Sequence, residues 1–264
     1  MAFSSASISG YTAKWVGENV ATTFDLSGKS ILITGAGRGL GRALAIGAAQ
    51  AGARVTAFDV DAAALENLRQ ASDSIATAVV DVADRKAFTA AADRIGRIDA
   101  VVNNAMLIRY DAIEAVDDAI LDRMLAIGIK GAVWGVQALL RHMDPQVGGV
   151  VLNLASPVAE RGFPKTAIYS MVKGAMGTFT RTLAAELGPR KVRVNALAPG
   201  SIPTPGAVAI TPQAEYERRA VSIPLRRIGR DEDATNASLF LLSDAASFIS
   251  GDILHVDGGF LASA

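Results

Sequence analysis

The stretch "TGAGRGLG", residues 34–41, decides how the rest of the sequence is interpreted. It follows a short apolar run, "KSILIT" at 29–34, and it opens a helical pattern over Gly39–Gln50. Glycine permits a tight turn and a close approach of backbone to ligand, and the amide groups at a helix N-terminus can face a pyrophosphate. A strand, a glycine-rich turn and a helix in this order favour dinucleotide binding over an ordinary tight turn.

The spacing of these glycines narrows the type of site. The common G-x-G-x-x-G pattern fails, because Leu40 stands where its last glycine would be. The pattern T-G-x-x-x-G-x-G fits instead, through Thr34, Gly35, Gly39 and Gly41.

Strand-like and helical patterns alternate along the rest of the chain. Further strands are predicted at 53–59, 74–81, 98–104, 148–156, 192–199 and 252–256, and further helices at 62–71, 85–95, 117–143 and 167–187. Asp61 and Asp84 are expected to cap two of these helices. Several strands are apolar on both faces, as in parallel sheets covered by helices. We therefore predict an α/β fold: a single Rossmann-type domain over 26–264, with a doubly wound parallel sheet of about seven strands and helices on both faces, preceded by an N-terminal arm over 1–25.

Composition excludes several classes of function. The 264 residues hold 26 basic and 26 acidic side chains, so no basic excess suggests a nucleic-acid or anionic-membrane partner. The absence of cysteine excludes disulfides and thiolate nucleophiles, and only His142 and His255 could supply imidazole, so no metal site is expected. No apolar run reaches the roughly 18 residues of a membrane span, and no secretory signal opens the chain. A cytoplasmic location is the expectation.

Asp59 ends the second predicted strand, 18 residues beyond Gly41. A carboxylate there can accept hydrogen bonds from the adenosine ribose and would repel a 2′-phosphate, which favours NAD over NADP. Two alternative interpretations oppose the preference for NAD. Asp59 could be a turn former, and Arg38 in the glycine loop could meet a 2′-phosphate.

The stretch "AIYSMVKGAM" at 167–176 places Tyr169 and Lys173 four residues apart, hence on one face of a helix. On their own they could be an amphipathic tyrosine beside a lysine whose stem covers apolar surface.

Together these motifs resemble the short-chain dehydrogenase/reductase family over residues 26–259. The glycine motif at 34–41 is followed by a "D-V" at Asp81 and Val82, and the family's "N-N-A-G" corresponds to "NNAM" at 103–106. Ser156 precedes Tyr169 by thirteen positions, Tyr169 and Lys173 form Y-x-x-x-K, and the family's "P-G" with following Ile and Thr is Pro199, Gly200, Ile202 and Thr204. The ending "SDAASFISGDILHVDGG" at 243–259 is also typical of this family.

The resemblance implies an NAD-dependent oxidoreductase that interconverts a secondary alcohol and its ketone, and that assembles as a homotetramer. It implies Tyr169 as the acid/base, Lys173 as the group that lowers the tyrosine pKa and binds the nicotinamide ribose, and Ser156 as a donor to the substrate oxygen. The implied cofactor-binding residues are Gly35, Arg38, Gly39, Leu40, Gly41, Asp59, Asp81, Val82, Asn103, Ala105, Tyr169, Lys173, Pro199, Gly200, Ile202 and Thr204. Ser156 could alternatively serve only a strand-end turn, and Thr204 could only shape the turn "SIPTPG".

Two positions depart from the family pattern. Gly128 stands where relatives carry an asparagine whose backbone carbonyl holds a water that connects the lysine to solvent, and Met106 replaces the last glycine of "N-N-A-G". Glycine keeps that carbonyl, so Gly128→Asn is expected to leave activity similar or to raise it. Two alternative functions remain open: an NADPH-dependent 3-oxoacyl-carrier-protein reductase, and a catalytically weak dinucleotide-binding module.

Overall fold

Seven strands build one sheet in the computed structural model, which describes residues 24–209 and 211–263. The strands are β1 (Ser30–Thr34), β2 (Arg54–Asp59), β3 (Ile75–Val79), β4 (Ala100–Asn103), β5 (Gly149–Leu154), β6 (Val192–Pro199) and β7 (Ile253–Val256). Their order is β3-β2-β1-β4-β5-β6-β7, and every neighbouring pair is parallel. The predicted α/β fold with a seven-stranded, doubly wound sheet is confirmed. The predicted arm over 1–25 lies outside the described residues, apart from Phe24 and Asp25.

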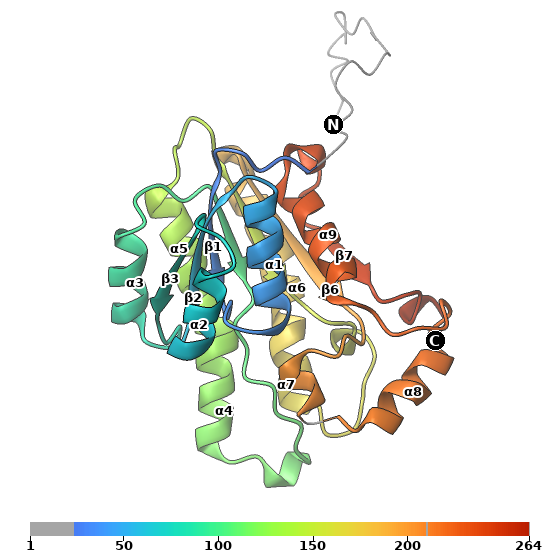
Figure 1. The fold of residues 1–264 in the computed structure, drawn as a ribbon. Coiled ribbons are helices and arrows are strands. Elements are labelled where there is room, and N and C mark those ends of the chain that lie inside the picture. The colour runs from blue at the N-terminus through green and yellow to red at the C-terminus, as the bar shows by residue number, and fades with distance from the viewer. Residues whose placement is uncertain (1–23, 210, 264) are drawn as a thin grey trace, which may run out of the picture.

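Helices cover both faces of this sheet (Figure 1). One face is covered by α1 (Gly39–Gln50), α2 (Ala62–Arg69) and α9 (Asp231–Leu242). The other is covered by α3 (Arg85–Asp93), α5 (Gly131–His142) and α6 (Ala167–Leu187). Further helices are α4 (Asp118–Leu125), α7 (Pro205–Val208) and α8 (Gln213–Ser222), and short 3₁₀ turns lie at Ile113–Ala115, Pro157–Ala159, Gly188–Arg190, Asp244–Ala246 and Leu261–Ser263.

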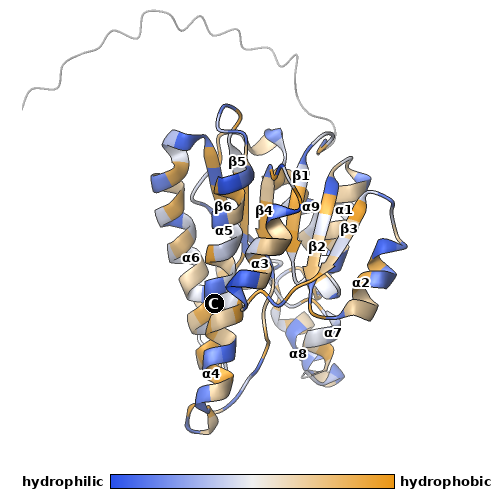
Figure 2. Cartoon of the chain, turned by 90° about the vertical axis from the view of Figure 1, so that its left-hand side faces the viewer, coloured by the Kyte–Doolittle hydropathy of each residue, from blue (hydrophilic) through white to orange (hydrophobic). Residues whose placement is uncertain are grey.

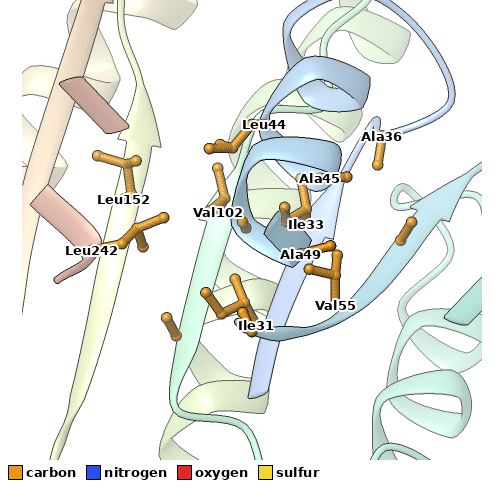
Figure 3. Close-up of a cluster of buried hydrophobic side chains, with 14 of the residues drawn as sticks. Ile31, Ile33, Ala36, Leu44, Ala45, Ala49, Val55, Val102, Leu152 and Leu242 are labelled. Atoms are coloured by element: carbon orange, nitrogen blue, oxygen red, sulfur yellow. The ribbon is translucent and has the colours of Figure 1, made fainter. Parts of the chain in front are cut away.

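Burial explains why this sequence forms a two-sided sheet. All five residues of β1 are buried, and hydropathy colouring shows apolar strands between helices that carry polar residues outside (Figure 2). Small residues let α1 lie close to the sheet: Ala45 and Ala49 point toward Ile31 and Ile33 in the close-up of this core (Figure 3). Helix and sheet therefore bury the same apolar surface, which is the main stabilising contribution of this layer.

The carboxyl ends of the strands meet at one edge, where α7, α8 and the lower end of α4 also lie (Figure 1). Strands β1 and β4 are neighbours, but the chain continues from β1 toward β2 and β3, and from β4 toward β5, β6 and β7. A strand order that reverses in this way leaves a crevice outside the carboxyl ends, where open α/β sheets bind ligands.

The elements differ from the prediction in two respects. The helix expected over 117–143 is divided into α4 and α5 by a π-helical turn, Ala126–Lys130, that contains Gly128. Helices α7, α8 and α9 have no counterpart in the prediction. Helix α8 is mostly polar, and Tyr216 is its single buried residue. The two predicted N-caps are confirmed: Asp61 accepts from the backbone of Ala64, and Asp84 from Lys86 and Ala87.

Candidate active site

A cavity of about 1190 Å³ opens at the carboxyl edge of the sheet. Its walls come from the loops that follow β1, β2, β4, β5 and β6, from α6, and from the segment that holds α7 and α8. The predicted site residues that line it are Gly35, Arg38, Gly39, Leu40, Asp59, Ala105, Ser156, Tyr169, Lys173, Pro199, Gly200, Ile202 and Thr204. Segments far apart in the sequence thus contribute to one site, as the motif order predicted.

The glycine loop forms one end of this cavity and has the features of a pyrophosphate site. Gly35 and Gly39 adopt φ angles of +64° and +54°, which residues other than glycine rarely adopt. A Cβ on Gly35 would lie 2.7 Å from the Cα of Ala105, so the loop can approach β4 only with glycine there. Helix α1 begins without a side-chain cap, which leaves its first amide groups available to an anion. The residues present therefore fit the phosphates of a dinucleotide.

The adenosine side of the cavity is acidic. One carboxylate oxygen of Asp59 accepts from the amide of Gly37 at 2.8 Å, and the other accepts from the amide of Asp61 at 3.0 Å. Both bonds hold the carboxylate toward the glycine loop. The guanidinium of Arg38 pairs with the Asp61 carboxylate, so its charge is already compensated. This pair reduces the ability of Arg38 to attract a 2′-phosphate.

Ser156, Tyr169 and Lys173 meet at the end of β5. Ser156 follows that strand, is 9% exposed, and accepts weakly from the amide of Val158 at 3.5 Å. Tyr169 and Lys173 occupy successive turns of α6, and the lysine Nζ lies 5.8 Å from the centroid of the tyrosine ring. The Lys173 Nζ also donates to the carbonyl oxygen of Leu154 at 2.6 Å, which fixes the buried ammonium under the tyrosine.

Burial controls the ionisation of this group of residues. Desolvation raises the pKa of Tyr169 well above its ordinary value, with a smaller contribution from Tyr110 and an opposing one from the Ser156 hydroxyl. Desolvation also lowers the pKa of Lys173 to about 8. Burial thus raises the pKa of Tyr169, although Lys173 was expected to lower it. The lysine Nζ is directed at the Leu154 carbonyl. With protein groups alone around it, Tyr169 is a phenol.

A buried polar network that includes the side chain of Asn103 supports α6 from beneath. The Nδ2 of Asn103 donates to the Oδ1 of Asn153 at 2.8 Å, and the Nδ2 of Asn153 donates to the Thr180 hydroxyl at 2.9 Å. Asn103 is 7% exposed and does not line the cavity. Its position inside β4 directs its side chain into the protein, and a cofactor contact by Asn103 stays a prediction.

Three other predicted cofactor residues also lie outside the cavity lining: Gly41, Asp81 and Val82. A Cβ on Gly41 would approach the Gly35 carbonyl oxygen to 2.2 Å. Gly41 therefore allows the glycine loop to pack against helix α1, although it does not line the cavity. Asp81 pairs with Arg123 at 2.8 Å and accepts from the amide of Ala83, while Val82 is buried in the core. An adenine contact by Asp81 and Val82 stays a prediction.

Thr204 has a structural contact of its own. Its hydroxyl caps α7 by accepting from the amide of Ala207 at 3.3 Å, in agreement with the turn-shaping interpretation. It also lines the cavity beside Gly39, where a Cβ would meet the threonine Cβ at 3.1 Å. Both interpretations of this residue therefore remain compatible with its position.

Several cavity residues were missed in the sequence. Asn104 donates to the carbonyls of Thr34 and Gly35 at 2.9 and 2.8 Å, and so ties β4 to the glycine loop. Its exposure follows from strand alternation, because the residue after Asn103 must face the opposite way. The other missed residues include Tyr110, Arg161, Tyr216, Arg219 and Phe260, which stand in loops or beyond the predicted elements. Their sequence surroundings carry no periodic pattern that would have placed them.

Gly128 and Met106, the two departures from the family pattern, lie next to each other. A Cβ on Gly128 would approach Val172 Cγ1 to 2.4 Å and Met106 Sδ to 2.9 Å. The methionine sulfur and the valine methyl group occupy the space that a larger residue would need. This close packing argues against the expectation that Gly128→Asn is tolerated.

Comparison with known proteins bears on the class of this site. The family model described as enoyl-(acyl carrier protein) reductase matches residues 35–261. The chain is 38% identical over 250 residues to a galactitol 2-dehydrogenase (L-tagatose-forming) of Cereibacter sphaeroides, covering 90% of this chain and 97% of that one. It is 35% identical over 240 residues to the L-xylulose reductase of Bos taurus, covering 90% and 98%. The chain belongs to the short-chain dehydrogenase/reductase family.

This short-chain dehydrogenase/reductase also shares its fold with solved structures. A 3-ketoacyl-(acyl-carrier-protein) reductase from Brucella melitensis in complex with NADH has a TM-score of 0.83 and 32% identity, over 89% of this chain and 99% of that one. The chain is therefore an NAD(P)-dependent oxidoreductase acting on CH–OH groups. Within the described residues, no helix is long and apolar enough to cross a membrane. The same residues hold no group of three or more acidic or histidine side chains suited to a metal ion.

Proposed function

We propose that this enzyme interconverts a secondary alcohol and its ketone with NAD, and that Tyr169 exchanges the proton. The observation that carries the proposal is the convergence of Ser156, Tyr169 and Lys173 at the end of β5, inside the cavity that the glycine loop also lines. When bound, the nicotinamide supplies or accepts the hydride. Every other step belongs to side chains of this chain.

Tyr169 supplies the proton at the substrate oxygen. In the reduction of a ketone its phenol donates a proton to that oxygen, and in oxidation its phenolate removes the alcohol proton. The Ser156 hydroxyl donates to the same oxygen and stabilises its developing negative charge. Because burial favours the phenol, oxidation requires help with ionisation, and the positive charge of Lys173 on the next turn of α6 supplies part of it.

The cofactor preference is the next part of the proposal. Asp59 lines the cavity with its carboxylate held by two backbone amides, while Arg38 is paired with Asp61. A carboxylate favours ribose hydroxyls and opposes a 2′-phosphate, which supports NAD over NADP. The residues that would hold the dinucleotide are the glycine loop, Asp59, Ala105, Lys173 and the segment from Pro199 to Thr204.

Two alternatives receive less support. A 3-oxoacyl-carrier-protein reductase would need a basic surface for an acidic carrier protein, yet the chain as a whole has 26 basic and 26 acidic side chains and no basic excess. A catalytically weak binding module would not need the serine, tyrosine and lysine together in one cavity. The proposal further includes a cytoplasmic location and a homotetramer, both taken from the family resemblance.

The test is a panel of secondary alcohols and ketones assayed with NAD(H) and with NADP(H). The proposal expects turnover of at least one alcohol–ketone pair, with a higher kcat/KM for NAD(H). Absence of turnover with every substrate and both cofactors would contradict it.

A further inference from the structure

A buried hydroxyl group on α8 lacks a partner. Tyr216 is 3% exposed, lines the cavity, and its hydroxyl has no hydrogen-bond partner among the described residues. A buried polar group without a partner destabilises a protein, so such a group usually has a ligand or functional role. A ligand atom that accepts or donates at this hydroxyl would complete its bonding.

Positive charge lies beside the ring that carries this hydroxyl. The guanidinium carbon of Arg219 is 5.9 Å from the centroid of the Tyr216 ring. Arg219 donates through Nε to Glu215 at 3.0 Å and through Nη1 to the Ser201 hydroxyl at 3.5 Å. Glu215 is shared, because Arg218 donates to the same carboxylate. One carboxylate thus faces two guanidinium groups, which leaves positive charge at this wall.

A third guanidinium stands at the same cavity. The Arg161 guanidinium carbon lies 4.7 Å from the ring centroid of Phe260 and 6.0 Å from that of Phe163. These two rings stack on each other at 5.9 Å, so they position the guanidinium by cation–π contact. Among the described residues, Arg161 has no carboxylate within 4.0 Å. The part of the cavity away from the glycine loop therefore carries an excess of positive charge.

Tyr110 connects this charged wall with the reacting end. Its ring packs edge-on against Tyr169, with centroids 5.5 Å apart at 75°. The charge of Arg219 and the nearby Tyr216 both act on the pKa of Tyr110, which burial raises. Tyr110 comes from the loop after β4 and Tyr216 from α8, so the two rings approach the cavity from different elements.

We propose that Tyr216 and Arg219 bind the carboxylate of a hydroxylated substrate whose carbinol carbon reacts at Tyr169. This inference rests on the proposed function and specifies its substrate class: a polyhydroxylated carboxylate of the sugar-acid type. An apolar alcohol would leave the Tyr216 hydroxyl unsatisfied. A neutral polyol would leave uncompensated the charge of Arg161 and the excess positive charge of Arg218 and Arg219 over their one shared carboxylate, Glu215. A carboxylate satisfies both, because Arg presents donors that match its two oxygens.

The first experiment compares matched substrates in the unaltered enzyme. D-Gluconate is paired with D-glucitol, and D-galactonate with galactitol, so that each pair differs in one carboxylate; butan-2-ol is the apolar reference. The carboxylate of at least one pair is expected to show a kcat/KM about tenfold or more above its alditol, since a charge-assisted hydrogen bond is worth about one factor of ten.

Variants assign that preference to the two side chains. Tyr216→Phe and Arg219→Gln should each raise KM for the carboxylate about tenfold and change kcat less, because neither group touches the reacting carbon. Tyr216→Phe should leave thermal stability equal or higher, since it removes an unsatisfied buried hydroxyl. A purely structural role would instead lower stability and affect all substrates alike.

Matched controls separate these effects from general damage. Thr235 on α9 also buries a hydroxyl without a partner among the described residues and lies outside the cavity lining, so Thr235→Val should leave KM unchanged. Arg69 pairs with Glu66 on α2, away from the cavity, and Arg69→Gln should likewise leave KM unchanged.

A binding measurement keeps this inference distinct from the proposed function. Calorimetry of the carboxylates with the NAD-loaded Tyr169→Phe protein, with and without Tyr216→Phe, needs no turnover. Binding that Tyr216→Phe weakens supports the site, even if no substrate is turned over and the proposed function fails. Three results would overturn the inference: equal turnover of carboxylates and alditols, no binding of carboxylates, or carboxylate binding that Tyr216→Phe does not weaken.

Discussion

At the scale of single residues, the carboxylate of Asp59 determines the expected cofactor preference. It lies at the cavity wall and accepts from the amides of Gly37 and Asp61. We predict that Asp59→Ala narrows the preference for NAD over NADP, because the ribose acceptor and the repulsion of a 2′-phosphate vanish together. The dissociation constants of NAD and NADP, measured by titration with intrinsic fluorescence or calorimetry for the unaltered protein and for Asp59→Ala, give this preference. Tighter binding of NADP than NAD by the unaltered protein would contradict the assignment.

Lys173 gives a second residue-scale prediction, in the pH dependence of stability. Its pKa is about 8 in the folded protein, below the ordinary value of 10.5, because the ammonium is desolvated. Between pH 8 and 10 the unfolded chain binds the proton that the folded protein has released, so the free energy of unfolding rises with pH. Above pH 10 the buried Tyr169, whose pKa is raised, acts in the opposite direction.

Urea unfolding at pH 7 and pH 9.5 measures that contribution. Relative to Lys173→Met, the unaltered protein should gain about 2 kcal/mol of unfolding free energy between these pH values, since one pKa unit corresponds to about 1.4 kcal/mol. The variant serves as the control, because it lacks the titrating group. A parallel pH dependence of the two proteins would show that Lys173 is not desolvated as described.

Sequence patterns identified some residues of the site and not others. Ser156, Tyr169 and Lys173 could be assigned because their spacing is characteristic. The inward direction of the Asn103 side chain could not be predicted, since the doubled asparagine does not say which side chain faces inward until the end of β4 is known. Tyr216 and Arg219 were not assigned, because the depth of their burial depends on how α8 lies across the cavity.

At the scale of elements, the π-helical turn Ala126–Lys130 is the feature that sequence patterns could not show. The apolar pattern continued from α4 into α5, so a single helix was predicted. Such turns are frequent at functional sites. Here the turn brings Gly128 against Val172 of α6, one residue before Lys173, so its packing bears directly on the catalytic helix.

We predict that Gly128→Ala and Gly128→Asn destabilise the protein by about 1–3 kcal/mol, because the added Cβ would overlap with Val172 Cγ1. Activity should fall with stability, as α6 must shift. Val172→Ala removes the overlapping methyl group, so the double variant Val172→Ala/Gly128→Ala should lose less stability than the two single losses added. Chemical denaturation of the unaltered protein, Gly128→Ala, Val172→Ala and the double variant gives the coupling free energy between the two positions. Strict additivity would contradict the close contact.

Helices α7, α8 and α9 show the limit of pattern-based prediction at this scale. The seven strands were recognisable because parallel strands are apolar on both faces. Helix α8 is mostly polar with one buried residue, and α7 spans only four residues, too few for a helical period to show. Helix α9 packs against α1 and against β5, β6 and β7, and these contacts between distant segments are invisible in local sequence.

At the scale of the whole molecule, assembly is a prediction from the family resemblance. The family resemblance implies contacts through the apolar stretches of α5 and α6 and through the last strand. Met171 on α6 is 48% exposed, and Phe248, shortly before β7, is fully exposed. Exposed apolar side chains of this size suit burial in an interface. Light scattering at micromolar concentration should give four times the chain mass of 27.3 kDa. A monomer under those conditions would contradict the prediction.

The whole account depends on proton exchange by Tyr169 in the cavity shared with the dinucleotide. The most direct test is the turnover number of Tyr169→Phe, measured on any substrate that the unaltered enzyme accepts, together with its dissociation constant for NAD. Removing one hydroxyl keeps the ring and its contact with Tyr110. The account predicts a fall in kcat of at least about a hundredfold, the usual contribution of general acid–base catalysis, with NAD affinity nearly unchanged. A Tyr169→Phe protein that turns over at the rate of the unaltered enzyme would contradict it.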